Sequence, residues 1–331
     1  MRFDVASSAL HDAKLQRRFS SLLDRCDQGV HDARVDAEVD STALFAAMSA
    51  ADQEYLRFLA TASAWSTEPP GRAFAVLAPR DVEIACKLAW TPLSVLVEDA
   101  KTDGAFISAI VALYGEPSVQ RVWALTSCSP PAWRFEHGGG SSTLAALQRL
   151  IAAAAQESRP PRVVVLIDSD RHQPDVEETD LKREVRALSQ VCKGALIPFV
   201  RLEKREVENY LPDSFWRAWV DRDRNRTARR AVIDALLRLD PRQRDHLDLE
   251  GDRRLLDPPP WLATIAEIDR MTLRGANLKQ AHWDETANMR AFTVLDLPRA
   301  VRDGEVTSAD VDARDPSGEL RALVRVLTEE L

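Results

Sequence analysis

Hydrophobic residues recur at helical spacing in the first part of the chain. From Ala6 to about Ala64 they lie three and four positions apart, as in LHDAKLQRRFSSLLDRC and STALFAAMSAADQEYLRFLATA, with Ser41 or Thr42 as an N-cap. The segment EPPG ends this pattern, and RAFAVLA (72–78) predicts a short strand before a helix over 79–90. We therefore expect a mainly helical N-terminal region over residues 1–90.

The pattern changes over residues 91–212, where short β-branched runs alternate with amphipathic stretches. The predicted strands cover 93–98, about 120–126, 162–168 and 196–202, with a further candidate at 132–136. The predicted helices cover 101–114, 141–156 and 175–191. This alternation is typical of βαβ units, so the fold class should be α/β, with a mostly parallel sheet flanked by helices. Helical periodicity returns over 213–331, which should form a mainly helical C-terminal region.

Composition narrows the class of protein. The chain has 331 residues, 45% of them hydrophobic, which is enough apolar material for one large or two modest domains. Its four cysteines are far apart and form no CxxC pair, so we expect neither a disulfide framework nor structural zinc. Membrane-spanning runs and a signal peptide are both missing, which predicts a cytoplasmic protein without a membrane partner. The net charge of −8 argues against a generally basic nucleic-acid coat, but metal-bound carboxylates would lower the total without repelling a substrate.

Three segments each begin with an apolar run and continue into acidic residues: SVLVEDAKTD, RVVVLIDSDR and VRLEKREVENYLP. The carboxyl ends of parallel strands meet at one edge of a sheet, so these acids should converge. Clustered carboxylates repel one another unless a hard cation such as Mg²⁺ lies among them. The leading hypothesis is therefore metal-assisted phosphate chemistry.

The first two segments supply the main candidate ligands. Glu98 directly follows a predicted strand and could bind a metal or act as a general acid or base. Asp99 and Asp103 would share a helix face, although Asp99 could simply cap that helix and leave Asp103 solvated. Asp168 and Asp170 would point the same way if their strand persists through them. A strand that ends in two acids one residue apart also occurs in the metal sites of nucleotide hydrolases, sugar transferases and aspartyl phosphatases. The chain has no GxxxxGK[ST] loop, which excludes a P-loop enzyme.

The third segment adds a carboxylate and a cation. Glu208 lies beside an aromatic residue and a Leu-Pro stop in ENYLP, and we expect it to be packed. Lys204 could stabilise negative charge on a phosphate, while Glu203 and Arg205 fit a solvated charge run. Arg171 is the last residue of the second segment and is either a phosphate contact or a solvated loop residue.

Two further features could contact phosphate. In HGGGSSTLAALQRL, backbone amides of Gly139, Gly140 and Ser141 precede a predicted helix and could bind an anion, or the segment is only a serine-capped turn. The HGGG string also occurs in esterase oxyanion loops, but the chain lacks a GxSxG nucleophile elbow. A second set, Arg222, Arg226 and Arg229, has spacings of four and three, so on one helix these arginines would share a face. That face would contact a nucleic-acid backbone or be solvated, with Asp221 and Asp223 interleaved.

The order VED…D, GGGSS, LIDSDR and ENYLP resembles TOPRIM domains of the overcoming-lysogenisation-defect (OLD) nuclease type, including stand-alone versions from bacterial antiphage systems. The resemblance covers about residues 92–212 and implies a core that holds one or two Mg²⁺ or Mn²⁺ ions and cleaves DNA or RNA. It assigns Glu98, Asp168, Asp170 and Glu208 as metal-site acids, with Asp103 as a further ligand. It also implies a catalytic lysine, for which Lys204 is preferred over Lys279.

The chain departs from the family pattern in two places. Asp99 follows Glu98 where the family has glycine, and Asp103 is five residues after Glu98 instead of four, which leaves the second ligand of this loop open. The fused ATPase module is missing, so nucleotide-driven control would require a separate ATPase or sensor protein as partner. The sequence predicts a metal-dependent nuclease of antiviral defence and leaves open its oligomeric state and DNA versus RNA. The alternatives are a non-hydrolytic TOPRIM-like sensing module and a metal-dependent phosphatase or nucleotidyl-transfer enzyme.

Overall fold

The computed structural model describes most of the chain. The described residues are 1–65, 73–125, 129–139, 142–171, 173–174, 183–222, 226–274, 276–284 and 289–331. For residues 64–65, 226–228, 280–284 and 289–292 it describes the backbone only. Within these residues, helices surround two parallel sheets of three and four strands, which confirms the predicted α/β class.

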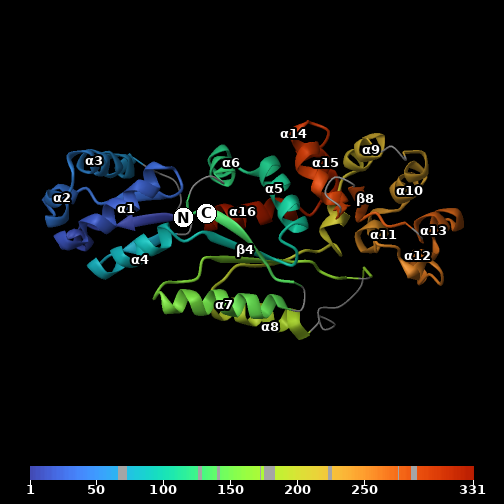
Figure 1. Cartoon of the computed structure of the whole chain (residues 1–331), viewed down its shortest axis with the longest axis horizontal. Coiled ribbons are helices and arrows are strands. Elements are labelled where there is room, and N and C mark those ends of the chain that lie inside the picture. Colours follow the sequence, from blue (N-terminus) through green and yellow to red (C-terminus); the bar gives the residue numbers. More distant parts are fainter. Residues whose placement is uncertain are drawn as a thin grey trace.

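The N-terminal residues form an α/β unit with its own hydrophobic core (Figure 1). Three parallel strands pair in the order β2-β1-β3: β1 is Arg2–Val5, β2 is Asp32–Val35 and β3 is Ala73–Val76. The helices of the unit are α1 (Gln16–Asp27), α2 (Ala43–Ala47), α3 (Ala50–Trp65) and α4 (Pro79–Ala89). Thr42 caps α2 as predicted, since its Oγ1 accepts a hydrogen bond from Phe45 N at 3.3 Å. The prediction of a helical lead-in before β3 was incomplete, because it missed β1 and β2, whose four-residue runs RFDV and DARV are half polar.

The central sheet pairs four parallel strands in the order β5-β4-β6-β7. Its strands are β4 (Leu93–Val97), β5 (Trp133–His137), β6 (Val163–Ile167) and β7 (Phe199–Arg201). The connecting helices are α5 (Thr102–Tyr114), α6 (Pro117–Ala124), α7 (Thr143–Gln156) and α8 (Arg183–Gly194). The predicted strand at 120–126 is wrong, because α6 occupies residues 117–124. Val119 and Trp123, one helical turn apart, are both buried there.

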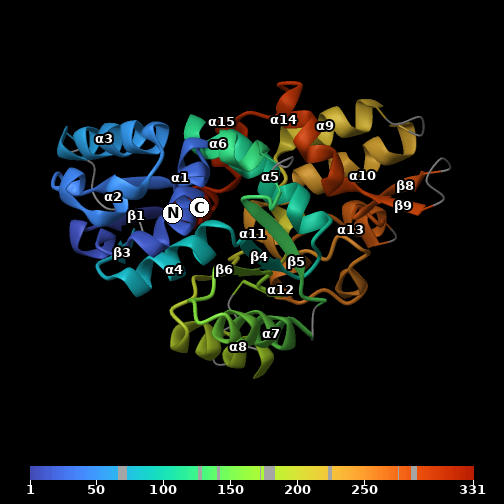
Figure 2. The same cartoon turned by 60° about the vertical axis from the view of Figure 1, so that its left-hand side comes forward.

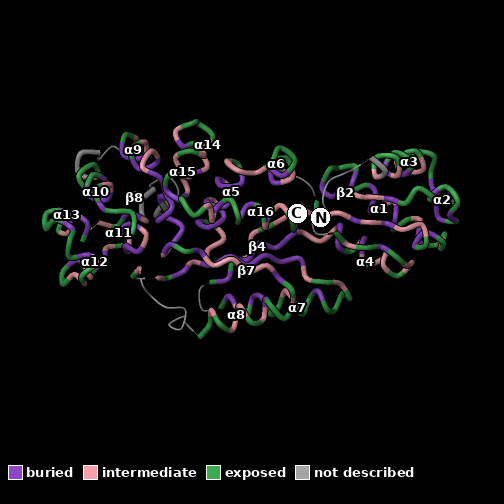
Figure 3. The backbone as a smooth tube through the Cα atoms, turned by 180° about the vertical axis from the view of Figure 1, so that it is seen from behind, coloured by how far each residue is buried: buried purple, intermediate pink, exposed green. Residues whose placement is uncertain are grey.

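Helices cover both faces of the central sheet, as a parallel sheet requires. Alternate side chains of β4 and β6 point to opposite faces: Val95 and Val164 belong to one core, Leu96 and Val165 to another. Figures 1 and 2 show α7 and α8 packed on one side of the sheet and α5 on the other. Figure 3 shows β4 as a buried strand near the centre of the molecule, and every residue of β4 and β6 is buried.

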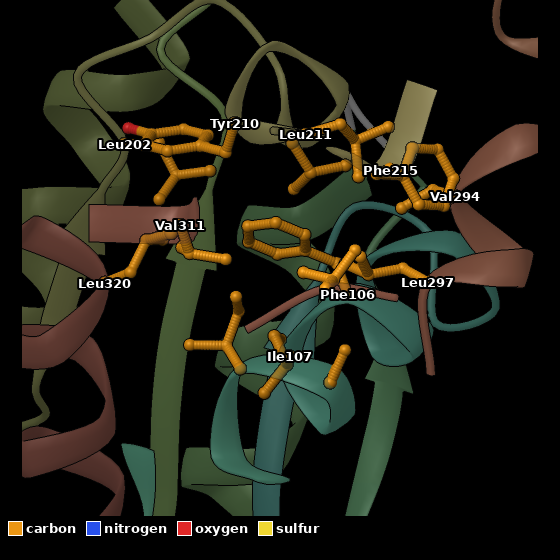
Figure 4. Close-up of a cluster of buried hydrophobic side chains, with 14 of the residues drawn as sticks. Phe106, Ile107, Leu202, Tyr210, Leu211, Phe215, Val294, Leu297, Val311 and Leu320 are labelled. Atoms are coloured by element: carbon orange, nitrogen blue, oxygen red, sulfur yellow. The ribbon is translucent and has the colours of Figure 1, made fainter. Parts of the chain in front are cut away.

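The C-terminal residues extend the core on the α5 side of the sheet. The helices of this C-terminal region are α9 (Asp213–Arg222), α10 (Arg226–Arg238), α11 (Pro241–His246), α12 (Pro260–Ala263), α13 (Glu267–Arg274), α14 (Leu297–Arg302), α15 (Ser308–Arg314) and α16 (Glu319–Glu330). An antiparallel hairpin, β8 (Gln280–Asp284) with β9 (Met289–Phe292), was not predicted. Figure 4 shows Phe106 of α5 among buried side chains from the segment after β7 and from the C-terminal helices. The predicted boundary at residue 212 therefore separates no independent core.

No helix within the described residues is long and apolar enough to cross a membrane.

Candidate metal centre

The parallel order of β4, β6 and β7 brings the ends of these strands to one edge of the central sheet. Glu98 follows β4, Asp168 follows β6, and Glu208 lies in the short 3₁₀ helix Val207–Tyr210 after β7. Burial raises the pKa of Asp168 well above its usual value, and the negative charges of neighbouring carboxylates add to this effect. These neighbours are, in order of effect, Asp103, Glu208, Glu98 and Glu206. The three acidic segments thus lie close enough to interact electrostatically.

Asp168 has an oxygen that is not satisfied. Its Oδ1 is buried, and no group among the described residues donates a hydrogen bond to it. A buried acceptor without a donor is unfavourable, and more so where four other acids act on it electrostatically. A cation would satisfy this oxygen.

Asp103 organises the loop that follows Glu98. Its Oδ2 accepts a hydrogen bond from Asp99 N at 2.9 Å, and Asp99 Oδ1 in turn accepts one from Lys101 N at 2.8 Å. Asp103 is buried, and burial raises its pKa to about 6. The alternative that Asp103 is solvated is therefore wrong, and the residue combines a local structural role with the largest electrostatic effect of any carboxylate on Asp168.

Asp170 does not continue the line of β6. The strand ends at Ile167, and the backbone turns so that Asp170 has a φ of 53°, in the left-handed region. Its amide donates to Arg205 O at 3.1 Å, and its side chain is exposed. The expectation that Asp168 and Asp170 point the same way on a continuing strand is therefore wrong, because this turn separates them.

The segment after β7 supplies one further acid, Glu206, which was not among the predicted site residues. Glu206 is buried, its Oε1 pairs with Lys279 Nζ at 2.9 Å, and its Oε2 is a buried atom without a hydrogen-bond partner within the described part of the chain. Glu208 is 6% exposed, and burial raises its pKa to about 7 although the positive charge of Lys279 opposes the shift. The only sequence signal for Glu206 was its place two residues before Glu208 in the same charged run.

The two candidate lysines have different partners. Lys204 is buried, and its Nζ lies 2.6 Å from Asp245 Oδ1 and 5.2 Å from the centre of the Tyr210 ring. Lys279 instead pairs with Glu206 and acts electrostatically on Glu208. The preference for Lys204 is not supported by this geometry, because Lys279 is the lysine that contacts the acidic group.

The glycine turn after β5 packs against the end of β4. Gly139 has a φ of 66°, and its amide donates to Glu98 O at 3.0 Å, so this amide is already occupied. Gly140 and Ser141 lie outside the described residues. Arg171 is partly exposed, and its carbonyl oxygen lies 3.2 Å from His246 Nδ1.

The arginines proposed to contact nucleic acid do not share one helix. α9 ends at Arg222 and α10 begins at Arg226, so the predicted common face is wrong. Arg222 Nη1 pairs with Glu305 Oε2 at 2.8 Å, and the Arg229 guanidinium lies 4.8 Å from the centre of the Trp219 ring. Only the backbone of Arg226 is described. Arg222 and Arg229 thus stabilise packing within the chain.

The chemistry of the acidic group fits a hard divalent cation, because carboxylate oxygens are the ligands that Mg²⁺ and Mn²⁺ prefer. The unsatisfied oxygens of Asp168 and Glu206 point to the same conclusion. In this arrangement, however, no three or more Asp, Glu, His or Cys side chains of the described residues are placed so that they could hold a metal ion. Like charges repel in the absence of a cation, so metal binding would require side-chain rotations that bring the carboxylates together.

Taken together, the fold and this group of side chains define an α/β protein with an acidic centre at the carboxyl edge of a parallel sheet. Comparison of the chain with protein-family models, with curated proteins and with solved structures gave no match.

Proposed function

We propose that the protein is a Mg²⁺- or Mn²⁺-dependent nuclease that cleaves phosphodiester bonds at the acidic edge of its central sheet. The observation that carries the proposal is Asp168, which has a buried oxygen without a donor among the described residues and whose pKa is raised by burial and by four carboxylates that follow neighbouring strands. A protein fold retains such repulsion mainly where a function requires it, and divalent cations relieve it.

The residues divide into ligands and supporting groups. Asp168, Glu98 and Glu208 would hold the metal, because they follow three strands whose ends meet at one edge of the sheet, and Glu98 and Glu208 both raise the pKa of Asp168. Asp103 would fix the loop after Glu98 and add negative charge. Bound Mg²⁺ would polarise the phosphate and lower the pKa of a coordinated water. Lys279 would place a compact positive charge beside the phosphate, where negative charge develops during cleavage.

The substrate and setting follow from the sequence resemblance to TOPRIM domains of the OLD nuclease type. We propose a nucleic acid, DNA or RNA, as substrate, and a cytoplasmic role in antiphage defence. We also propose an ATPase or sensor protein as the partner that would control the activity.

The test is incubation of the purified protein with plasmid DNA and with total tRNA, each in Mg²⁺, Mn²⁺ or EDTA. Cleavage should need a divalent metal and should disappear in Asp168→Asn. Asp40→Asn is the matched control, because it removes the same charge from a side chain that is 58% exposed and far along the chain from the site. Cleavage by Asp168→Asn at the wild-type rate, or cleavage in EDTA, would contradict the proposal.

A second candidate function is a non-hydrolytic sensing module. Two observations favour it: Lys279 already pairs with Glu206, and no three acids among the described residues are placed for a metal. Under this alternative neither nucleic acid is cleaved under any metal condition, although the protein still folds.

A further inference from the structure

The loop that carries Asp168 is held by the segment after β7. Ser169 Oγ donates to Lys204 O at 2.6 Å, and Asp170 N donates to Arg205 O at 3.1 Å. Ser169 is buried, so its hydrogen bond is shielded from water. We call residues 168–171 the aspartate loop.

The end of α11 contacts both the aspartate loop and the segment after β7. Arg205 N donates to Asp245 O at 2.9 Å, and Lys204 Nζ lies 2.6 Å from Asp245 Oδ1. The next residue, His246, places its Nδ1 3.2 Å from Arg171 O, at the far end of the aspartate loop. Asp245 and His246 therefore hold the segments after β6 and β7, two of the three strands whose ends carry the acidic centre.

The contact between His246 and Arg171 fixes the tautomer of the imidazole. A carbonyl oxygen only accepts hydrogen bonds, so Nδ1 must carry the proton and donate it. The ring is held in place, because His246 is 8% exposed and packs edge-on against Trp261 at 6.3 Å between ring centres. In addition, Arg254 Nη2 donates to His246 O at 2.8 Å.

We propose that His246 is a positioning residue for the acidic centre, acting on Asp168 through the carbonyl of Arg171. The proposal rests on the proposed function. A left-handed residue such as Asp170 costs free energy and persists only where surrounding contacts fix it. Removal of the His246 hydrogen bond would let the aspartate loop relax, and Asp168 would lose its orientation toward the other carboxylates.

Two amide variants of nearly equal polarity separate the hydrogen bond from simple packing. The amide nitrogen of His246→Asn falls near the position of Nδ1 and can still donate to Arg171 O, whereas that of His246→Gln falls near Nε2 and cannot. The measurements are Mn²⁺ binding by calorimetry, the Mn²⁺ dependence of cleavage, and the midpoint of thermal unfolding. His246→Gln should bind Mn²⁺ roughly 10- to 100-fold more weakly, and His246→Asn should stay within about threefold of wild type, as for other groups that orient metal ligands.

Ser169→Ala provides a second test, because it removes an independent hydrogen bond of the same loop with little change in volume. It should weaken Mn²⁺ binding in the same direction as His246→Gln, at a temperature where every variant is folded. Wild-type Mn²⁺ affinity in both variants would overturn the positioning role while leaving the nuclease proposal intact. Equal weakening in His246→Asn and His246→Gln would also overturn it. A wild-type protein that neither binds Mn²⁺ nor cleaves nucleic acid would overturn the proposed function, and the positioning role with it.

Discussion

Replacement of Glu208 by Gln should stabilise the metal-free protein at pH 8 and leave its stability nearly unchanged at pH 4. Glu208 is 6% exposed, and burial raises its pKa from 4.5 to about 7. Glutamine has nearly the same shape and never ionises, so the variant removes the buried negative charge alone.

The sign and size follow from proton linkage. Between pH 4.5 and about 7, the folded protein keeps a proton on Glu208 that the unfolded chain has released. The free energy of unfolding therefore falls as the pH rises through this window and stays at the lower value above it. At ~1.4 kcal/mol for each pH unit, the difference of 2.5 pH units corresponds to at most about 3.5 kcal/mol. Below pH 4.5 the residue is protonated in both states, so the substitution has little effect.

Urea unfolding in EDTA at pH 4 and pH 8 measures this difference. Tryptophan fluorescence is a suitable signal, because Trp216 and Trp219 are buried in the core beside the central sheet. Glu54→Gln is the control, since it removes the same charge from an exposed position on α3. If Glu208→Gln changes the free energy of unfolding equally at both pH values, buried ionisation of Glu208 is not the cause and the reasoning is refuted.

Three further predictions concern other parts of the site and the fold. Asp168→Asn should abolish metal-dependent cleavage without lowering the midpoint of urea unfolding, because it relieves repulsion among buried acids. Lys279→Met should lower the cleavage rate by about 100-fold or more, because it removes the positive charge beside the acidic centre. Lys204→Met should mainly lower the free energy of unfolding, by about 2 kcal/mol, because it leaves Asp245 with fewer partners. Measurements of the cleavage rate and of urea unfolding on both variants distinguish the two roles. Arg162→Met should cost at least about 3 kcal/mol in urea unfolding, since this buried guanidinium donates to four backbone carbonyls, from Leu88 O at 3.3 Å to Thr91 O at 2.6 Å.

The central strands β4 and β6 could be predicted because their sequences are continuous apolar runs. LSVLV and VVVLI are apolar throughout, and every residue of β4 and β6 is buried, as in a parallel sheet covered on both faces. Short amphipathic runs give a weaker signal. The apolar side chains of residues 120–126 fit both the helical and the strand period. Pro117 at the start of α6 and the packing of α6 against α5 favour the helix.

The candidate site could be predicted only where a carboxylate directly follows a strand. Glu98 and Asp168 satisfy this condition, and strand order alone brings them to the same edge. The orientation of Asp170 depends on the hydrogen bond from its amide to Arg205 O. Arg205 lies beyond another helix and strand, so the spacing of Asp168 and Asp170 in the sequence contains no information about this contact.

The positive charge at the site could not be located from sequence spacing, since it comes from another part of the chain. Five carboxylates at one edge require compensating cations, and Lys204 was preferred from the sequence because it lies within the third acidic segment. The folded chain pairs Lys204 with Asp245 and brings Lys279, just before β8, to Glu206. Together with the contact of His246 to the aspartate loop, this makes the C-terminal helical region part of the acidic centre. A boundary at residue 212 would therefore divide the site, even though all the acids that surround Asp168 precede it.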